Sequence, residues 1–171
     1  MSPVKLLPLF TLILLLLSCR KDVDSVSSSI TVGNKKFNVN HAYYFDVGID
    51  DGEYIKSFYL TDKPLYGFDD PNFYITIETR TVGDSFKGGY FSQSYKAPQY
   101  AILTIGDEDE SEVFMDTGDI EITGSKSNYT IEFEGELTDG RSIQGKIKGG
   151  FEKGPGFEVP FAKGETIIVK N

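Results

Sequence analysis

Side chains suited to catalysis or metal binding are scarce in this chain of 171 residues. It contains one histidine, His41, and one cysteine, Cys19. Zinc sites need clusters of Cys or His, and the chain has one residue of each type. A Ser–His–Asp triad would have to use His41, and the chain has no Gly-x-Ser-x-Gly elbow. We therefore expect no catalytic residue, no zinc site and no cofactor, and interpret His41 as an ordinary histidine at the start of a strand.

Carboxylates are the abundant reactive group, with 26 Asp and Glu residues. Calcium takes six to eight oxygen ligands, often from loops. We expect no metal site; the one candidate for calcium is Asp107 with Asp109, in an acidic run that lacks the glycine of an EF-hand loop. The alternative is a solvated turn beside an edge strand. Two carboxylates facing each other across a cleft would allow glycoside hydrolysis.

Aromatic rings are a further candidate for ligand binding. The chain has 10 Tyr and 13 Phe but no Trp. Tyrosines in loops can stack on sugar rings or anchor a protein partner; the alternative is that they pack back over the sheet. We expect two long loops, between Thr61 and Pro71 and between Thr81 and Gln99. These contain the candidate ligand-binding residues Tyr66, Phe68, Tyr90, Phe91 and Tyr95.

The net charge of the chain argues against two classes of binding partner. The formal net charge is −9, and a strongly acidic chain repels phosphate backbones and anionic lipid headgroups. We therefore expect no nucleic-acid partner and no basic surface that docks on a membrane.

The amino terminus predicts a membrane anchor of another kind. An apolar stretch of about 12 residues follows Lys5, which fits a signal peptide better than a membrane-spanning helix of roughly 20 residues. Leu16-Leu17-Ser18-Cys19 resembles the bacterial lipobox, in which cleavage before the cysteine frees a thiol for lipid attachment. We therefore expect residues 1–18 to be a signal peptide, and acyl chains such as palmitate on Cys19 to hold residues 19–29 at the membrane as a flexible tether.

Residues 20–24, Arg-Lys-Asp-Val-Asp, are similar to the Lys-then-acidic signal of surface-exported Bacteroidota lipoproteins. The alternative is a solvated charged linker. The expected location is thus the cell envelope, at the outer membrane, with exposure on the cell surface as one alternative.

Period-2 alternation of apolar and polar residues predicts a single all-β domain over residues 30–171, with no helix. The fold class we expect is an antiparallel β-sandwich, with a calycin- or lipocalin-like β-barrel as the alternative. The predicted strands are residues 30–32, 36–39, 42–47, 54–61, 73–79, 100–105, 112–115, 119–123, 129–137, 142–151 and 166–170.

The clearest element is a hairpin from Tyr129 to Phe151. Apolar residues face each other across it only if the loop has three residues, Thr138-Asp139-Gly140, with the glycine in the left-handed conformation. In that register Glu132 is opposite Lys146, and Phe133 lies over Gly145.

Four motifs between residues 30 and 151 resemble those of small Bacteroidota lipoproteins of uncharacterised function. They are Val32–Phe37 (VGNKKF), Gly118–Gly124 (GDIEITG), Tyr129–Phe133 (YTIEF) and Asp139–Phe151 (DGRSIQGKIKGGF). The resemblance implies an antiparallel β-sandwich or a calycin-like barrel in the cell envelope. It implies no catalytic residue, because the shared motifs are glycines and alternating strands.

These observations predict a lipid-anchored lipoprotein whose domain binds a glycan or a protein partner through aromatic loops, without catalysis. Three alternatives stay open: a structural envelope subunit without a small ligand, a lipocalin-like carrier of an apolar ligand, and a small hydrolase.

Overall fold

The computed structural model describes residues 26–65, 70–92, 99–107 and 112–154, and this part of the chain contains eleven strands and no helix. The predicted all-β fold is therefore confirmed. The strands are β1 (Ser27–Val32), β2 (Lys35–Phe37), β3 (His41–Asp50), β4 (Glu53–Thr61), β5 (Phe73–Val82), β6 (Gly89–Ser92), β7 (Gln99–Asp107), β8 (Val113–Ser125), β9 (Asn128–Leu137), β10 (Ser142–Gly150) and β11 (Glu152–Lys153).

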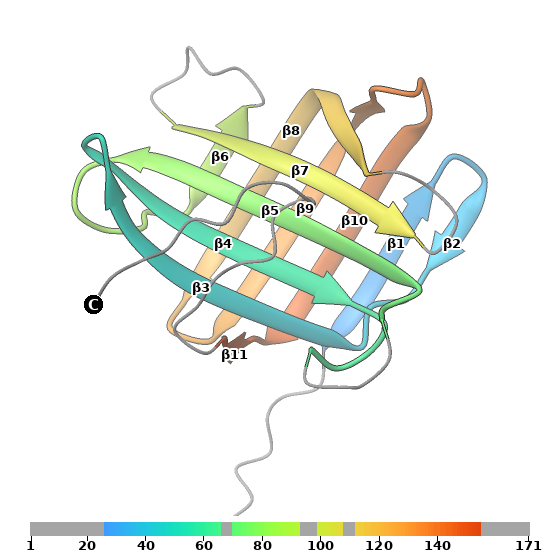
Figure 1. Ribbon diagram of the computed structural model, residues 1–171, viewed down its shortest axis with the longest axis horizontal. Coiled ribbons are helices and arrows are strands. Elements are labelled where there is room, and N and C mark those ends of the chain that lie inside the picture. Colours follow the sequence, from blue (N-terminus) through green and yellow to red (C-terminus); the bar gives the residue numbers. More distant parts are fainter. Residues whose placement is uncertain (1–25, 66–69, 93–98, 108–111, 155–171) are drawn as a thin grey trace, which may run out of the picture.

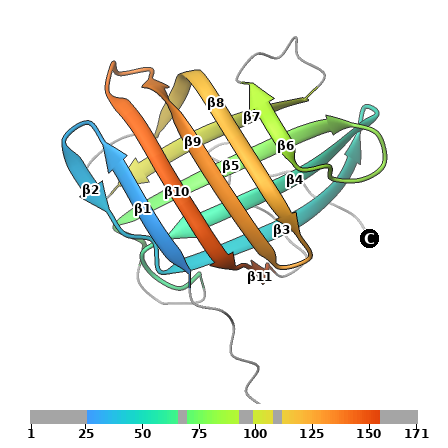
Figure 2. The ribbon, with the colours of Figure 1, turned by 180° about the vertical axis from the view of Figure 1, so that it is seen from behind.

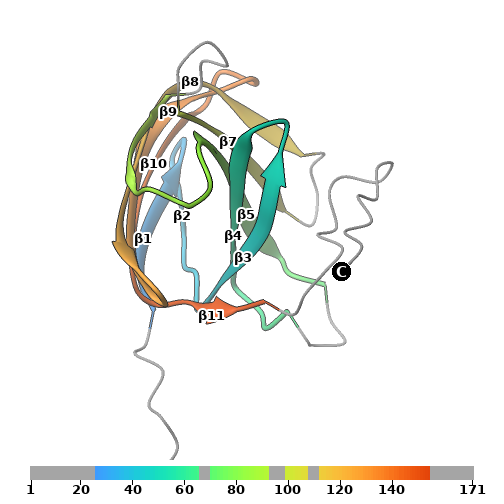
Figure 3. The ribbon, with the colours of Figure 1, turned by 90° about the vertical axis from the view of Figure 1, so that its left-hand side faces the viewer.

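All eleven strands belong to one sheet, in the order β11-β3-β4-β5-β7-β6-β8-β9-β10-β1-β2 (Figure 1). Most neighbours are antiparallel, whereas β11 pairs with β3 and β6 with β7 in parallel. The sheet curls into a half-barrel, so that β3, β4, β5 and β7 form one layer and β6, β8, β9, β10, β1 and β2 form the other (Figures 2 and 3). The fold thus combines the two predicted alternatives, because a barrel-like sheet encloses a two-layered core.

The core lies between the two layers and is built by strict alternation along the strands. In β5, for example, Phe73, Ile75 and Ile77 are buried, while Tyr74 and Thr76 between them are only partly buried. Full burial of such a side chain contributes about 1.5–3 kcal/mol relative to exposure. The largest fully buried side chains are Phe58, Phe91, Phe151, Ile30, Leu60, Ile75, Ile77, Leu103, Ile120, Ile122, Ile131 and Leu137.

The hairpin of β9 and β10 has the predicted register. Glu132 pairs with Lys146, and Phe133 pairs with Gly145. Gly140 has a φ of +83°, the left-handed conformation that the three-residue loop requires. Gly145 is needed for a different reason: a Cβ atom at this position would collide with the ring of Phe133.

Three segments differ from the sequence prediction. The segment between Thr81 and Gln99 contains strand β6 where we expected only a loop, since four residues are too few to give a clear alternation. The predicted strands 112–115 and 119–123 form a single strand, β8, which begins at Val113 and accommodates Asp116 as a bulge instead of ending in a turn. Ser27–Ser29, predicted as tether, already belong to β1. The predicted strand 166–170 lies outside the described residues.

Candidate functional site

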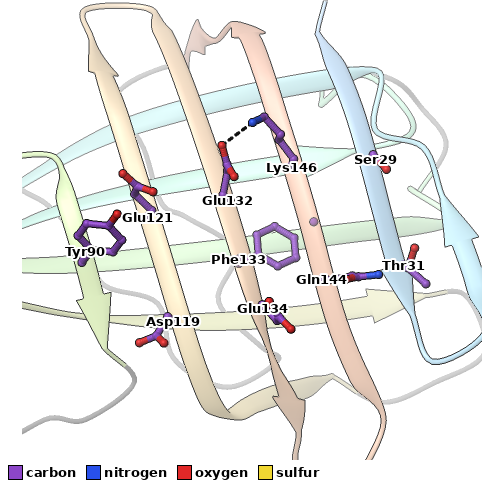
Figure 4. Close-up of a pocket in the computed structure, with 11 residues that line it drawn as sticks. Ser29, Thr31, Tyr90, Asp119, Glu121, Glu132, Phe133, Glu134, Gln144 and Lys146 are labelled. Atoms are coloured by element: carbon purple, nitrogen blue, oxygen red, sulfur yellow. Dashed lines mark hydrogen bonds and ion pairs between the residues drawn. The ribbon is translucent and has the colours of Figure 1, made fainter.

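The outward surface of the layer formed by β6, β8, β9, β10 and β1 carries two adjacent rows of polar side chains. Cross-strand pairing sets the first row as Tyr90, Glu121, Glu132, Lys146 and Ser29. The second row runs parallel to it and consists of Ser92, Asp119, Glu134, Gln144 and Thr31. We call these ten residues the polar face; nine of them are labelled in Figure 4, and Ser92 is not drawn.

The polar face is hollowed. A shallow depression of about 450 Å³ is lined by nine residues of the face, together with Phe133 and Gly145 (Figure 4). This volume is within the range of small-ligand sites, roughly 300–1,000 Å³. The face extends over five strands, or about 19 Å at the usual spacing between strands of about 4.8 Å.

Tyr90 is the aromatic residue at one end of this depression. Strand β6 directs Phe91 into the core, where it is 1% exposed, and so turns Tyr90 outward, where it is 73% exposed. The ring lies on the strand beside Glu121, its cross-strand partner. A large ring held out in solvent beside hydrogen-bonding groups can stack on a planar or weakly polar ligand surface.

The electrostatics of the polar face are unbalanced. Glu121 is directly opposite Glu132, and Asp119 is directly opposite Glu134. Like charges in such positions destabilise a sheet. Lys146 neutralises one of these four carboxylates, Glu132, through an ion pair of 2.6 Å. The face is therefore rich in hydrogen-bond acceptors and attracts donors and cations.

The candidate residues from the sequence fall into three groups. Tyr90 lines the depression, whereas Phe91 packs in the core, with its ring stacked at 6.1 Å from that of Phe86. Asp107 is the last residue of β7. The other candidates, Cys19, Tyr66, Phe68, Tyr95 and Asp109, lie outside the described residues.

Several carboxylates elsewhere have protein partners. Asp46 pairs with Lys56, while Asp50 and Glu53 lie 3.8 and 3.6 Å from the guanidinium of Arg80. Within the described ranges, no group of three or more His, Cys, Asp or Glu side chains is placed to hold a metal ion.

Lys56 is a buried cation on the inner surface of β4, 5% exposed. Its ammonium lies 2.5 Å from Asp46 and 4.5 Å from the ring centroid of Tyr44. The rings of Phe86 and Tyr129 are 5.4 and 5.6 Å away. Because a carboxylate and three aromatic faces satisfy this charge, we interpret the cluster as structural.

The sequence analysis identified Tyr90 but no other residue of the polar face, because it selected aromatic residues in the expected loops. A usable signal was present: Asp119 and Glu121 alternate with apolar residues in the same way as Glu132 and Glu134. The missing step was the position of β6, which sets Tyr90 beside Glu121.

A scan of protein-family models and searches of curated proteins and solved structures found no match to this chain. In the part of the chain that the structure describes, no helix has the length and hydropathy to cross a membrane.

Proposed function

We propose that this protein is a lipid-anchored lipoprotein of the bacterial cell envelope, at the outer membrane, that binds a glycan on its polar face without chemically changing it. The observation that carries the glycan proposal is the hollowed face itself, where exposed Tyr90 stands beside a surface of hydrogen-bond acceptors. The anchor rests on the sequence around Cys19.

The groups on the face match the chemistry of a sugar. Sugar hydroxyls donate hydrogen bonds to carboxylates, and such charge-assisted bonds are stronger than neutral ones. Gln144, Ser29 and Thr31 add neutral donors and acceptors at the far side of the depression. A tyrosine ring supplies the apolar surface on which a sugar ring stacks. The excess of carboxylates favours neutral or amine-bearing sugars over sulfated or uronic ones.

Non-enzymatic binding is supported by the openness of the face. Glycosidases protonate the leaving group with a carboxylic acid whose pKa is raised in a closed, apolar site. The carboxylates of the polar face lie instead on a shallow surface of the sheet, where Glu132 remains 47% exposed. The packed core between the layers likewise favours surface binding over transport of an apolar ligand inside the fold.

The glycan proposal is tested by calorimetric titration of the protein with cellohexaose, xylohexaose, mannohexaose and chitohexaose, with a heparin hexasaccharide as the anionic comparison. We expect at least one neutral or amine-bearing oligosaccharide to bind and the heparin fragment not to bind. If none of the neutral sugars binds, the glycan proposal fails and the structural alternative is favoured, an envelope subunit without a small ligand.

A second candidate function is binding of a cationic protein segment, favoured by the opposed carboxylate pairs of β8 and β9. Titration with a lysine-rich peptide at increasing salt distinguishes binding of a cationic segment from binding of a glycan. Attraction between exposed charges is screened within about 8 Å at 0.15 M salt, so peptide binding would weaken steeply with salt while sugar stacking would persist.

The anchor is tested separately in cells. We expect a palmitate analogue to label the wild-type protein and Cys19→Ser to remove both the label and the membrane attachment. Membrane attachment that survives this substitution would contradict lipidation at Cys19.

A further inference from the structure

A second depression lies on the outward surface of the layer that carries the polar face. Its volume is about 360 Å³. Four of the residues that line it form one row across the strands, from Thr123 through Thr130 and Lys148 to Ser27. The row lies at the edge of the layer where β1 begins and where β8 and β10 end (Figure 2).

This row directly continues the polar face. On each of β8, β9, β10 and β1, a residue of the row is two positions from a residue of the polar face, so both side chains point to the same side of the sheet. Lys148, for example, follows Lys146 on β10. Two residues of a strand span only about 7 Å. An oligosaccharide bound on the polar face can therefore extend into the second depression.

The second depression offers hydrogen-bond donors where the polar face offers acceptors. None of the residues that line it carries a carboxylate, and Lys148 supplies an ammonium group. This ammonium has no ion-pair partner within the described residues, whereas that of Lys146 is paired with Glu132 at 2.6 Å. The amide of Asn128 and three hydroxyl groups add further donors.

Backbone forms part of the wall of this depression. Gly124 and Gly149 line it and have no side chains, so a ligand can lie directly against the main chain there. Both glycines are cross-strand partners of Tyr129, whose ring is buried. The hydroxyl of Tyr129 donates to the carbonyl of Lys126 at 3.0 Å and so fixes the turn between β8 and β9 beside the depression.

We infer that the second depression is a further subsite of the glycan site and takes the acetamido group of an N-acetylated sugar. This inference rests on the proposed function. The carbonyl oxygen of an acetamido group accepts a hydrogen bond, which the ammonium of Lys148 donates as a charge-assisted bond. The acetamido N–H donates to a threonine hydroxyl, and the methyl group packs on the bare backbone of Gly124 and Gly149.

Nearby charges decide between an acetamido group and a carboxylate, since the ammonium of Lys148 attracts both. Glu121 and Glu132 are in the adjacent row of the polar face. The row spacing of about 7 Å is shorter than the screening length of about 8 Å at 0.15 M salt. A carboxylate in the second depression would therefore be repelled by these glutamates, whereas a neutral carbonyl group is not. The subsite thus selects a neutral N-acetylated sugar.

Calorimetric titration of the protein with three β-1,4-linked hexasaccharides tests this inference. Cellohexaose, chitohexaose and a glucuronic acid hexamer share one backbone and differ in bearing only hydroxyl, acetamido or carboxylate groups. We expect chitohexaose to bind at least about tenfold more tightly than cellohexaose, because it gains a charge-assisted hydrogen bond. The glucuronic acid hexamer should not bind.

Two lysine variants show whether the preference arises at this subsite. Lys148→Met should reduce the ratio of the two affinities to about twofold or less, because it removes the charged donor. Lys35→Met is the matched control, since Lys35 is an exposed lysine on β2 that lines neither depression, and it should leave the ratio unchanged.

The outcomes separate this inference from the proposed function. Equal binding of cellohexaose and chitohexaose, or a preference that Lys148→Met leaves intact, would overturn the inference while the glycan proposal stands. Tighter binding of the glucuronic acid hexamer than of chitohexaose would show that the subsite selects an acid, and would overturn it too. If no hexasaccharide binds, the proposed function itself fails.

Discussion

The ammonium of Lys56 and the carboxylate of Asp46 are cross-strand partners on β4 and β3, 2.5 Å apart, and they differ in exposure. Lys56 has 6% of its side chain exposed, whereas Asp46 has 33%. Asp46 also accepts a hydrogen bond of 3.1 Å from the hydroxyl of Tyr54. Lys56 therefore depends on Asp46 for its counter-charge more than Asp46 depends on Lys56, because solvent and Tyr54 also reach the carboxylate.

This asymmetry predicts that Asp46→Asn is more destabilising than Lys56→Met. Asp46→Asn leaves a buried ammonium without a counter-charge, which we expect to cost about 1–3 kcal/mol, less than the roughly 3–5 kcal/mol of a fully buried pair. Lys56→Met keeps the volume among the rings and leaves a carboxylate that water still reaches, so its cost should be about 1 kcal/mol or less. Urea unfolding of both variants measures this order, and the reverse order would contradict it.

The same ion pair predicts a loss of stability in acid. Burial raises the pKa of Asp46, but the hydrogen bond and charge of Lys56 outweigh burial and hold this pKa below its ordinary value of 3.8. A carboxylate with a lowered pKa in the folded state stabilises the fold above its ordinary pKa, and the contribution is lost as the pH falls through the folded-state pKa.

The difference in unfolding free energy between wild type and Asp46→Asn should therefore be largest near pH 6 and shrink below pH 4. Denaturant titrations between pH 6 and pH 3 measure it. A difference that stays constant over this range would show that the charge on Asp46 contributes nothing to stability.

The contact between Gly145 and Phe133 predicts a strong effect of a small substitution. Gly145→Ala places a methyl group against the Phe133 ring, and overpacking of this kind costs about 1–3 kcal/mol. Phe133→Leu in the same protein should relieve part of this cost, so the double variant should be more stable than the sum of the single effects predicts. Lys148→Ala, on the exposed side of β10, is the control and should change stability by less than about 0.5 kcal/mol.

Much of this fold could be predicted because alternation and turn chemistry act locally. The β9–β10 register followed from matching apolar positions across a three-residue loop, and both Glu132–Lys146 and Phe133–Gly145 are present. What could not be predicted depends on distant pairing. Strand β6 is too short to have its own signal and is held by β8, which lies far along the chain.

The candidate site was only partly accessible from sequence for the same reason. Tyr90 was predicted as a candidate ligand-binding residue, but its neighbours were not, because Asp119 and Glu121 reach it only through sheet pairing. The curling of the sheet, which brings the two layers together, has no signature in any single strand.

Tyr90 is predicted to contribute to glycan affinity and not to stability. Tyr90→Ala should weaken binding of the oligosaccharide found in the titrations at least tenfold, or about 1.4 kcal/mol, because it removes the stacking surface. Phe114→Ala is the matched control, since Phe114 is 45% exposed and does not line the depression. An equal loss of affinity in both variants would place the binding surface elsewhere.

The central claim, that the polar face binds a glycan, is tested most directly by mapping amide chemical shifts of the isotopically labelled protein during titration with that oligosaccharide. We predict that the shifted amides cluster on β6, β8, β9 and β10, around Tyr90, Glu121 and Gln144. Shifts confined to the outward surface of β3, β4 and β5, or no shifts at saturating sugar, would contradict it.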